Sequence, residues 1–326
     1  MHKNDIVDYL MPFVANALFL HCFMATEARH RYAVTVGFFD GVHKGHRFLI
    51  DTLKETACKY GLLSQIVTFA EHPRQILQSD YVPLLISTPE DKIRMLKETG
   101  ADLCTTLHFT PEMASKDART FMADILQKEL GADLLLVGHD HRFGHDNISN
   151  FETYREIGTE LGLKVLQAEA LMWKDKPVSS SRIRSSLSLG NVFEATEMLG
   201  YCYSISGTVV HGLKNGRKIG FPTANLGPHC ELLQIPANGV YAAWADIDGK
   251  RYKSMLNIGF RPTISSGEER RTIEAHLLNF NRDIYGQELR LSFVEYIRPE
   301  RRFESLEALA AQLSADRRTV SDTLTL

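Results

Sequence analysis

The stretch Tyr32–Tyr60, YAVTVGFFDGVHKGHRFLIDTLKETACKY, decides the fold of the first half of the chain. Its first five residues form a β-branched run that ends at Gly37, which favours a β-strand. Residues 47–60 then repeat apolar side chains at helical spacing and stop at Gly61. A strand that turns through glycines into a helix predicts one unit of an α/β fold.

The alternation of strands and helices continues to about residue 169. Thr88-Pro89-Glu90-Asp91 indicates a helix start, because it combines a capping residue, a first-turn proline and acidic residues. Residues 115–130 repeat apolar side chains at helical spacing. Further strands are expected at 65–69, 103–107, 134–137 and 164–169. Such alternation predicts a parallel sheet, in which ligands bind beyond the carboxyl ends of the strands.

The second half of the chain has a different pattern. A run of five or six strands with a hairpin turn at Asp248-Gly249 predicts a small antiparallel barrel. The strands are expected at 204–210, 240–247, 252–258, 272–278 and 289–297. A closing helix near 305–315 is expected to pack on the barrel through Leu306, Leu309, Ala310 and Leu313. We place the boundary near residue 186, which gives domains of 1–186 and 187–326.

Composition indicates globular domains. The 326 residues are 44% hydrophobic and 24% charged, unlike a disordered chain. The net charge of -3 argues against a dedicated nucleic-acid binder, but not against a local site for an anionic ligand. The five cysteines are scattered without a CxxC pair, so we expect no disulfide framework, no cysteine-rich zinc site and a cytoplasmic location. We expect no membrane and no obligate protein partner.

Residues 10–25 are largely apolar, but they are too short for an ordinary membrane-spanning helix. They also make a poor signal peptide, because Lys3 is offset by Asp5 and Asp8. Two alternatives stay open for this segment: an additional amphipathic helix, or a misassigned start with Met24 as the true one.

The first candidate site is the decapeptide 37–46, GFFDGVHKGH, where the first strand passes into the first helix. Glycines let a ligand approach the backbone, and a helix N-terminus attracts phosphate. His43 and His46 can both donate hydrogen bonds to phosphate oxygens. Two surface histidines, or half of a metal site, are the alternatives. The crowding of glycine, aspartate and histidine in one turn favours the ligand site.

This decapeptide resembles the HxGH signature of α/β nucleotidyltransferases, and more closely the form found in bacterial bifunctional riboflavin kinase/FAD synthetases. The resemblance implies adenylyl transfer, in which an acceptor phosphate attacks the α-phosphorus of ATP and pyrophosphate leaves. It implies that His43 and His46 hold phosphates and that Asp40 orders the turn or meets the nucleotide. It also places four residues of the turn in the ATP site: Gly37, Phe38, Asp40 and Gly45.

Three further strings resemble the same family: 68–73 (TFAEHP), 137–144 (VGHDHRFG) and 178–184 (VSSSRIR). For the second, the resemblance implies that Asp140 orients the nucleotide and that Phe143-Gly144 shape a flavin or adenine pocket. For the third, it implies that the β- and γ-phosphates of ATP are bound by Ser180, Ser181 and Arg184. Arginine suits this role because it stays charged and bonds two oxygens at once. A solvated linker is the alternative for the third string.

The sequence departs from the family pattern at three places. Ser181 stands where threonine is usual, which keeps the hydroxyl, and His141 stands where phenylalanine is common. After Gly144 the chain reads HDNISN instead of basic and glycine residues, so the flavin contacts of this loop stay open. His139, His141 and His145 also suggest a transition-metal site, although no fourth ligand follows.

The second candidate site spans 211–226, HGLKNGRKIGFPTANL. Its glycine spacing matches neither a Walker A loop nor a kinase glycine-rich loop, and a polar hairpin is the alternative. The string GxxxGFPTAN resembles the signature of riboflavin kinase, whose fold is a six-stranded barrel. The resemblance implies that Thr223 and Asn225 hold Mg²⁺ and ATP phosphates through oxygen atoms, which Mg²⁺ prefers. It assigns these residues to ATP or flavin binding: Gly212, Gly216, Gly220, Pro222, Thr223, Asn225, Gly239 and Tyr241.

Two later strings, 238–241 (NGVY) and 257–263 (NIGFRPT), resemble the same kinase family. Residues 272–278 alternate, which places Glu274 and His276 on the face opposite the apolar residues. Glu274 matches the family's proposed base, which takes the proton from the ribityl 5′-hydroxyl as it attacks the γ-phosphate. An exposed strand glutamate is the alternative.

The resemblance covers about residues 32–316 and implies a bifunctional enzyme of flavin-cofactor synthesis. The barrel is expected to convert riboflavin and ATP into FMN and ADP. The α/β half is expected to convert FMN and ATP into FAD and pyrophosphate, and both steps are expected to need Mg²⁺. Two alternatives stay open: a riboflavin kinase with a degenerate or regulatory N-terminal domain, and a flavin-sensing protein without turnover.

Overall fold

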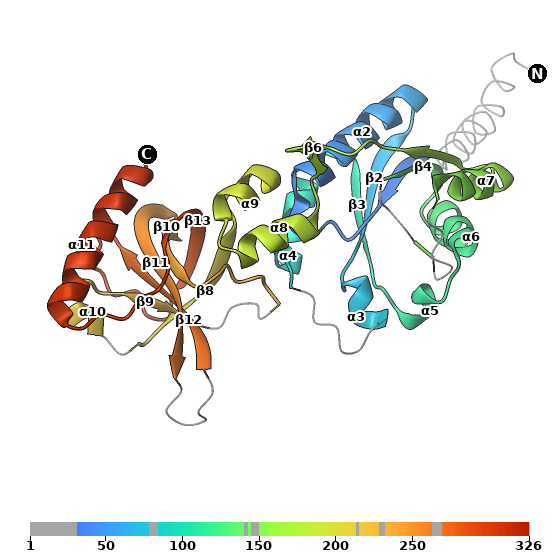
Figure 1. Cartoon of the computed structure of the whole chain (residues 1–326). Coiled ribbons are helices and arrows are strands. Elements are labelled where there is room, and N and C mark those ends of the chain that lie inside the picture. Colours follow the sequence, from blue (N-terminus) through green and yellow to red (C-terminus); the bar gives the residue numbers. More distant parts are fainter. Residues whose placement is uncertain are drawn as a thin grey trace, which may run out of the picture.

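The computed structural model describes residues 31–77, 84–139, 143–144, 150–212, 215–227, 232–262 and 269–325. They form a unit with a parallel sheet and a unit with a closed barrel. Helices α8 (Ser180–Ser188) and α9 (Val192–Leu199) lie between the two sheets (Figure 1). The predicted fold class, an α/β unit followed by a six-stranded antiparallel barrel, is confirmed. The apolar N-terminal stretch lies outside the described residues.

The parallel sheet has the strand order β3-β2-β1-β4-β5. Its strands are β1 (Tyr32–Val36), β2 (Leu63–Phe69), β3 (Leu103–Leu107), β4 (Ala132–Val137) and β5 (Lys164–Gln167). The order reverses between β1 and β4, which are paired although about 100 residues separate them. Crevices at such reversals, beyond the carboxyl ends of the strands, are where open α/β sheets bind ligands.

Helices pack on both faces of this sheet. Helix α2 (Lys44–Tyr60) packs Leu53 and Ala57 on one face, and η2 (Phe121–Glu129) packs Met122 on the other. The remaining helices of this unit are η1 (Asp40–Val42), α3 (Pro73–Leu77), α4 (Pro89–Lys97), α5 (Pro111–Ala114), α6 (Ala118–Thr120) and α7 (Phe151–Leu161).

Local signals set the ends of these helices. The Thr88 hydroxyl accepts the N–H of Asp91 at 3.1 Å, as the predicted helix start requires. The predicted start at residue 115 is wrong. The helical run begins at Ala118, because the Asp117 carboxylate accepts the N–H of Thr120 at 2.7 Å and caps the chain there.

The barrel closes in the order β10-β11-β12-β9-β8-β13. Its strands are β8 (Ser204–Val210), β9 (Ala224–Leu226), β10 (Gly239–Ile247), β11 (Lys250–Pro262), β12 (Glu269–Leu277) and β13 (Glu288–Arg298). Strand β9 was not predicted; its three residues pair with β12, and Asn225 and Leu226 also pair with β8, which completes the barrel. Helix α10 (Asn215–Lys218) precedes it, and a small hairpin joins β6 (Met172–Trp173) to β7 (Lys176–Pro177).

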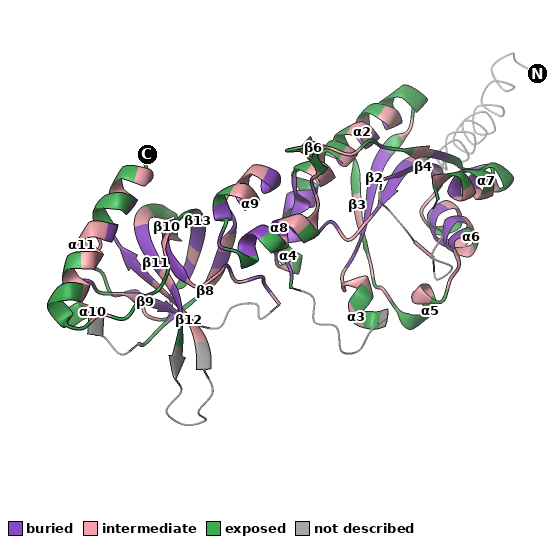
Figure 2. Ribbon diagram, in the orientation of Figure 1, coloured by how far each residue is buried: buried purple, intermediate pink, exposed green. Residues whose placement is uncertain are grey.

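One apolar core runs from α8 and α9 into the barrel interior (Figure 2). Helix α11 (Leu306–Thr323) lies along the outside of the barrel and buries Val320 there, with Leu313 beside it. The predicted packing through Leu306 is wrong, since that side chain is 58% exposed. Within the described ranges, every helix is too short or too polar to span a lipid bilayer.

The two units also contact each other away from α8 and α9. The N–H of Leu85 donates to the carbonyl of Leu232 at 2.6 Å, and the N–H of Gln234 donates to the carbonyl of Leu85 at 2.8 Å. The Tyr201 hydroxyl donates to the carbonyl of Gly41 at 2.6 Å. These bonds tie the turn after β1, and the segment before α4, to the second unit.

Removing the Asp316 carboxylate tests how α11 is held. Arg298 donates to Asp316 from Nε at 3.0 Å and from Nη2 at 2.7 Å, and Asp316 is 2% exposed. Because Asp316→Ala leaves a largely buried guanidinium unpaired, it should lower the free energy of unfolding by about 3 kcal/mol. Asp246→Ala breaks the exposed pair with Arg251 and should cost less than about 1 kcal/mol. Equal losses in urea unfolding would contradict this.

Candidate active sites

The decapeptide 37–46 borders two adjoining cavities beyond the carboxyl ends of β1 and β4. One has a volume of about 230 Å³ and the other about 220 Å³. The two share His46, Leu49, Gly138 and Ser180, and we call them together the switch-point cavity. The site therefore lies where the strand order reverses, as the sequence pattern predicted for a parallel sheet.

The two histidines of the motif lie face to face in this cavity. Their ring centroids are 3.5 Å apart, and Nδ1 of His43 accepts the N–H of His46 at 3.2 Å, which caps α2. Burial lowers the pKa of His43 to about 3 and the pKa of His46 well below its usual value. Both rings are therefore neutral at pH 7. Since Nδ1 of His43 is an acceptor, its proton is on Nε2, where it can be donated to a ligand.

One nitrogen of this pair has no partner in the structure. Nδ1 of His46 is buried and has no hydrogen bond within the described residues. A buried polar atom without a partner carries a desolvation cost, which a bound ligand would remove. Gly45 keeps the space open, because a Cβ there would lie 3.1 Å from the Val178 carbonyl and 3.2 Å from the His43 ring.

Asp40 organises the turn, as one of its two predicted roles requires. Its carboxylate is 4% exposed and accepts the N–H groups of Ile86 at 2.9 Å and Ser87 at 3.3 Å. Nη1 of Arg184 donates to it at 2.8 Å. Burial raises the pKa of Asp40, and these donors limit that rise. Arg184 was expected to bind phosphate. One of its nitrogens donates a hydrogen bond to Asp40, and its side chain also lines the cavity.

The other predicted residues of the first site lie around the same cavity. Ser180 lines both parts and donates from its hydroxyl to the Asp40 carbonyl at 3.2 Å, while Ser181 is exposed at one part. Gly37 and Phe38 line the other part. Asp140 lies outside the described residues. The structure therefore brings the described histidine and ATP-site residues together around one cavity. Phe143 and Gly144, expected to shape a flavin or adenine pocket, line neither part of it, and Phe143 packs against Phe121 and Tyr154 instead.

One further lining residue belongs to a family-like string but had no predicted role. His72, in the string 68–73, lines the cavity and meets the edge of the Phe38 ring at 4.7 Å between centroids. Burial lowers the pKa of His72 to about 4, so this ring is neutral as well. The residue stands directly before Pro73, at the start of α3 and beyond the end of β2.

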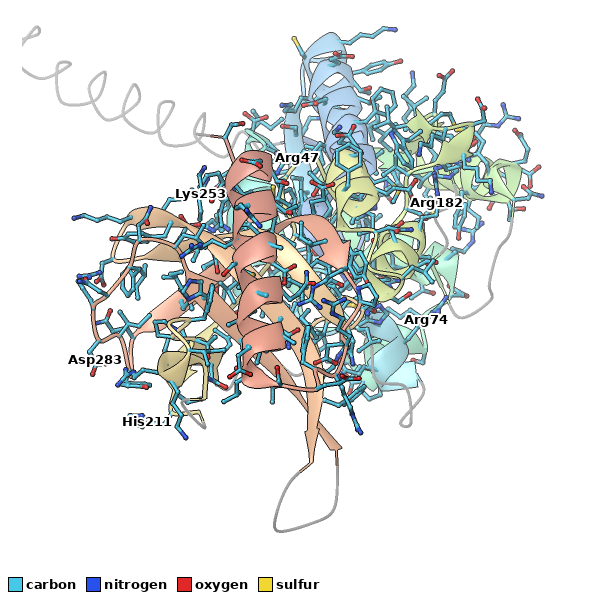
Figure 3. The ribbon with its side chains drawn as sticks, turned by 60° about the vertical axis from the view of Figure 1, so that its left-hand side comes forward. Arg47, Arg74, Arg182, His211, Lys253 and Asp283 are labelled. Carbon is cyan, nitrogen blue, oxygen red and sulfur yellow. The ribbon has the colours of Figure 1, made fainter. Side chains whose placement is uncertain are left out.

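The second site consists of two cavities that meet at one residue. The cavity at the barrel mouth, of about 300 Å³, is lined by apolar side chains and by polar or charged ones that include Arg217, Asn281 and Arg282. The cavity between the barrel wall and α11, of about 360 Å³, is lined about equally by apolar side chains and by polar or charged ones that include Glu274, Arg298 and Arg301. Thr223 lines both. His211 and Asp283 lie at the mouth end, near α10 (Figure 3).

The shared residue faces the predicted base. The Thr223 hydroxyl donates to Oε2 of Glu274 at 3.3 Å, and Glu274 is the register partner of Asn225 across β12 and β9. Residues 223 and 225 alternate to the outer face of β9, because Ala224 and Leu226 are in the barrel core. Thr223, Asn225 and Glu274 therefore form one polar cluster on the outside of the barrel.

Two neighbours hold this cluster in place. His276, on the same face of β12, is 7% exposed and hydrogen-bonds through Nδ1 to the Pro222 carbonyl at 2.8 Å. Burial lowers the pKa of His276, so its Nδ1 carries a proton as the donor of a neutral ring. Gly212 lies against Asn225, and a Cβ there would come within 2.3 Å of the Asn225 amide. A larger residue at 212 would push that amide away.

The remaining predicted residues are distributed unevenly. Gly216 lines the cavity under α11, and Pro222 lines the cavity at the barrel mouth. Gly220, Gly239 and Tyr241 line neither of these two cavities. Tyr241 is fully buried in the barrel core, where its hydroxyl donates to the Ala237 carbonyl. Its location thus gives it a packing role in the barrel.

The donor set of the polar cluster suits Mg²⁺. A threonine hydroxyl, an amide oxygen and a carboxylate are hard oxygen donors, which this ion prefers together with water and substrate phosphates. The transition-metal alternative has no support in the described part of the chain, where no group of three metal-ligating side chains occurs. His141 and His145 lie outside that part.

The buried histidines predict an acid-sensitive stability. Below pH 6.5 the unfolded chain binds a proton at His43 and the folded chain does not, so the free energy of unfolding falls as pH drops toward 4.5. The slope from His43 is at most about 1.4 kcal/mol per pH unit. His43→Asn keeps a capping side chain and should remove this slope in urea unfolding. His211→Asn, at an exposed position, should keep it, and identical slopes in both variants would refute the assignment.

Comparison with known proteins agrees with this geometry. The FAD synthetase family model matches residues 25–182, and the riboflavin kinase family model matches residues 199–324. A solved structure described as a macrolide-efflux protein from Streptococcus pneumoniae has a TM-score of 0.80 and 33% identity, and the match covers 89% of this chain and 94% of that chain.

Curated relatives match across both units. The bifunctional riboflavin kinase/FMN adenylyltransferase of Bacillus subtilis (strain 168) is 34% identical over 294 residues, which is 89% of this chain and 92% of the relative. The enzyme of the same name from Escherichia coli (strain K12) is 34% identical over 290 residues, covering 89% of this chain and 91% of the relative. Since both family models match in order and these relatives are covered almost from end to end, the chain belongs to the bifunctional riboflavin kinase/FMN adenylyltransferase family.

Proposed function

We propose that the barrel phosphorylates riboflavin with ATP to give FMN and ADP. The observation that carries this proposal is the contact between Thr223, which lines both cavities, and Glu274. Phosphoryl transfer between two substrates needs a donor site and an acceptor site that meet at the reacting atoms. The two cavities meet in this way at the polar cluster.

Particular side chains in the two linings support an assignment of the substrates. The barrel mouth offers Arg217 and Arg282, which suit the phosphates of ATP. The cavity under α11 offers the rings of Phe221 and Phe303, which suit the flat ring system of a flavin, although charged side chains such as Arg298 also line it. The ribityl chain would then extend toward Thr223, where its 5′-hydroxyl reaches the γ-phosphate.

In this arrangement Glu274 accepts the proton of the ribityl 5′-hydroxyl as the oxygen attacks the γ-phosphorus. The Thr223 hydroxyl already donates to the Glu274 carboxylate, which fixes the direction of the carboxylate before substrate binds. Thr223 and Asn225 would hold Mg²⁺, which when bound neutralises charge on the phosphates of ATP. His276 keeps the Pro222 carbonyl, and with it the turn that carries Thr223, in position.

We infer that the α/β unit transfers the adenylyl group of ATP to the phosphate of FMN, which releases pyrophosphate. The attacking oxygen belongs to FMN, so no nucleophile of the protein is required, and positioning with charge stabilisation supplies the catalysis. His43 and His46 would donate hydrogen bonds to phosphate oxygens from neutral rings. Ser180, Ser181 and the free side of Arg184 would bind the leaving pyrophosphate. The unpartnered Nδ1 of His46 supports this assignment.

The division of the chain at residue 186 stays a prediction. It falls inside α8, whose first turn faces the switch-point cavity through Ser180 and whose later residue Leu187 packs in the core shared with the barrel. We propose residues 1–186 as the adenylyltransferase domain and 187–326 as the kinase domain. The cytoplasmic location expected from the cysteine pattern also stays a prediction.

The proposal is tested by separating the products of the purified protein by chromatography. Riboflavin with ATP and Mg²⁺ should give FMN and then FAD, and supplied FMN should give FAD. Formation of FMN alone would favour the alternative of a kinase with a degenerate N-terminal domain. Flavin binding without consumption of ATP would favour the sensing protein.

Glu274→Gln should reduce FMN formation by about 10²- to 10⁴-fold, because it removes the general base and keeps the shape of the side chain. Supplied FMN should still be converted to FAD at the wild-type rate. Glu295→Gln, at an exposed position on β13, should leave both activities unchanged. A kinase rate within a few-fold of wild type in Glu274→Gln would show that another group takes the proton.

His46→Ala should reduce FAD formation from supplied FMN by about 10²-fold, since it removes one donor to the phosphates in a buried site. FMN formation from riboflavin should be retained in His46→Ala. Glu274→Gln serves as the control with the opposite expected result, since it should lose FMN formation and keep FAD formation. If both activities fell together, the two sites would not be separate.

A further inference from the structure

Lys92 is a buried cation on α4 next to the switch-point cavity. Its side chain is 2% exposed, and Nζ donates to the Phe69 carbonyl at 2.7 Å. Phe69 is the last residue of β2, at the ligand-binding edge of the sheet. Lysine is among the residues least often buried without a charged partner, so its presence here requires a reason.

The same ammonium group also contacts a residue that lines the cavity. Nζ lies 3.7 Å from the centroid of the Phe38 ring, which is a close cation–π contact. Phe38 lines the switch-point cavity beside His72, and the Thr68 hydroxyl donates to the Phe38 carbonyl at 3.1 Å. Lys92 thus connects the strand end at Phe69 to the Phe38 ring at the cavity.

No carboxylate of the described residues forms an ion pair with Lys92. The charged or titratable groups that face it are Asp40 of η1, Glu71 and His72 after β2, and Cys104 of β3. Burial lowers the pKa of Lys92 to about 8, and Asp40 is the strongest of the groups that oppose this. Asp40 is itself engaged by Arg184 and by two backbone N–H groups.

Within the described residues, the protein therefore keeps a positive charge without a direct ion-pair partner behind the wall of the cavity. A methionine would fill the same volume without the desolvation cost, and buried charges are often replaced by apolar residues without loss of stability. An anion in the cavity would add to the stabilisation of this charge that Asp40 already provides. ATP and FMN, the substrates proposed for this unit, are both anions.

We propose that Lys92 is a positioning residue for adenylyl transfer. It fixes the Phe38 ring and the end of β2, and it supplies a buried positive charge that attracts the substrate phosphates. This inference rests on the adenylyl transfer proposed for the first unit. Lys92 does not line the cavity, so its effect on the substrates acts through Phe38 and through the electrostatic field across the cavity wall, where the charge is screened less than in bulk water.

The role proposed for Lys92 predicts a specific pH dependence of FAD synthesis. Lys92 is protonated below pH 8 and loses its charge as pH rises above 8, so the KM for ATP or FMN in FAD synthesis should rise above that pH. Bound phosphate favours the charged form, so the kcat of the saturated enzyme should change at a higher pH than kcat/KM does. A purely structural lysine would give neither effect.

The experiment compares Lys92→Met, Lys92→Arg and wild type as full-length proteins, from pH 6.5 to 9.5. Lys92→Met should lower kcat/KM for FAD synthesis at pH 7 at least about tenfold, mainly through KM, and should lose the decline near pH 8. Lys92→Arg should restore most of the activity and move the decline upward, since arginine stays charged. Lys97→Met, at an exposed position on the same helix, should behave as wild type, and all variants should retain riboflavin kinase activity.

Three outcomes overturn the inference. They are a Lys92→Met enzyme with wild-type KM, an alkaline decline that persists in Lys92→Met, and an equal loss of both activities in Lys92→Met and Lys92→Arg. Wild type is measured in the same assay to separate this test from that of the proposed function. If wild type makes no FAD from FMN, the proposed activity fails; if wild type and Lys92→Met make it equally well, only the role of Lys92 fails.

Discussion

The buried carboxylate of Asp40 is the interaction on which the first site depends. A carboxylate that is 4% exposed is tolerated only when donors surround it, and the donors here come from two distant parts of the chain. The N–H groups of Ile86 and Ser87 precede α4, and Arg184 belongs to α8, 144 residues away in sequence. The same turn carries His43 and His46 into α2. Asp40 therefore fixes the positions of the histidines, of the segment before α4 and of the Ser/Arg helix relative to one another.

The two sites achieve phosphate chemistry by different physical means. The first uses the reversal of a parallel sheet, where strand ends and a helix start converge on one crevice. The proposed second site lies on the outer face of a barrel, where Thr223 and Glu274 meet between the cavity at the barrel mouth and the cavity under α11. No described residue lines both the switch-point cavity and either cavity of the barrel. FMN made in the barrel must therefore leave that site before it can enter the other.

Local patterns predicted most of the fold and pointed to residues that lie around the switch-point cavity, but they did not predict the contacts between distant segments. Strands β1, β3 and β8 were predicted at their observed bounds, because each is a short run that contains β-branched residues. Strand β9 was missed because it has three residues and owes its pairing to β8 and β12 rather than to its own composition. Lys92 was missed because a lysine in a short helix is normally solvated. Its burial depends on the Phe69 carbonyl and the Phe38 ring, and both are contributed by other elements.

The hydrogen bonds that support the first site extend into the second unit. Leu85 is hydrogen-bonded on both sides to the segment 232–234, and the next two residues of the chain are the N–H donors to Asp40. On the barrel side, the same segment is held by the Tyr203 hydroxyl, which donates to the Gln234 carbonyl at 2.7 Å from within the barrel core. A displacement of that segment would move Leu85, and with it the donors on which the Asp40 carboxylate depends. The two sites share no lining residue among the described ones, but the first site still depends on the barrel. The barrel supports the backbone segment that supplies the N–H donors to Asp40.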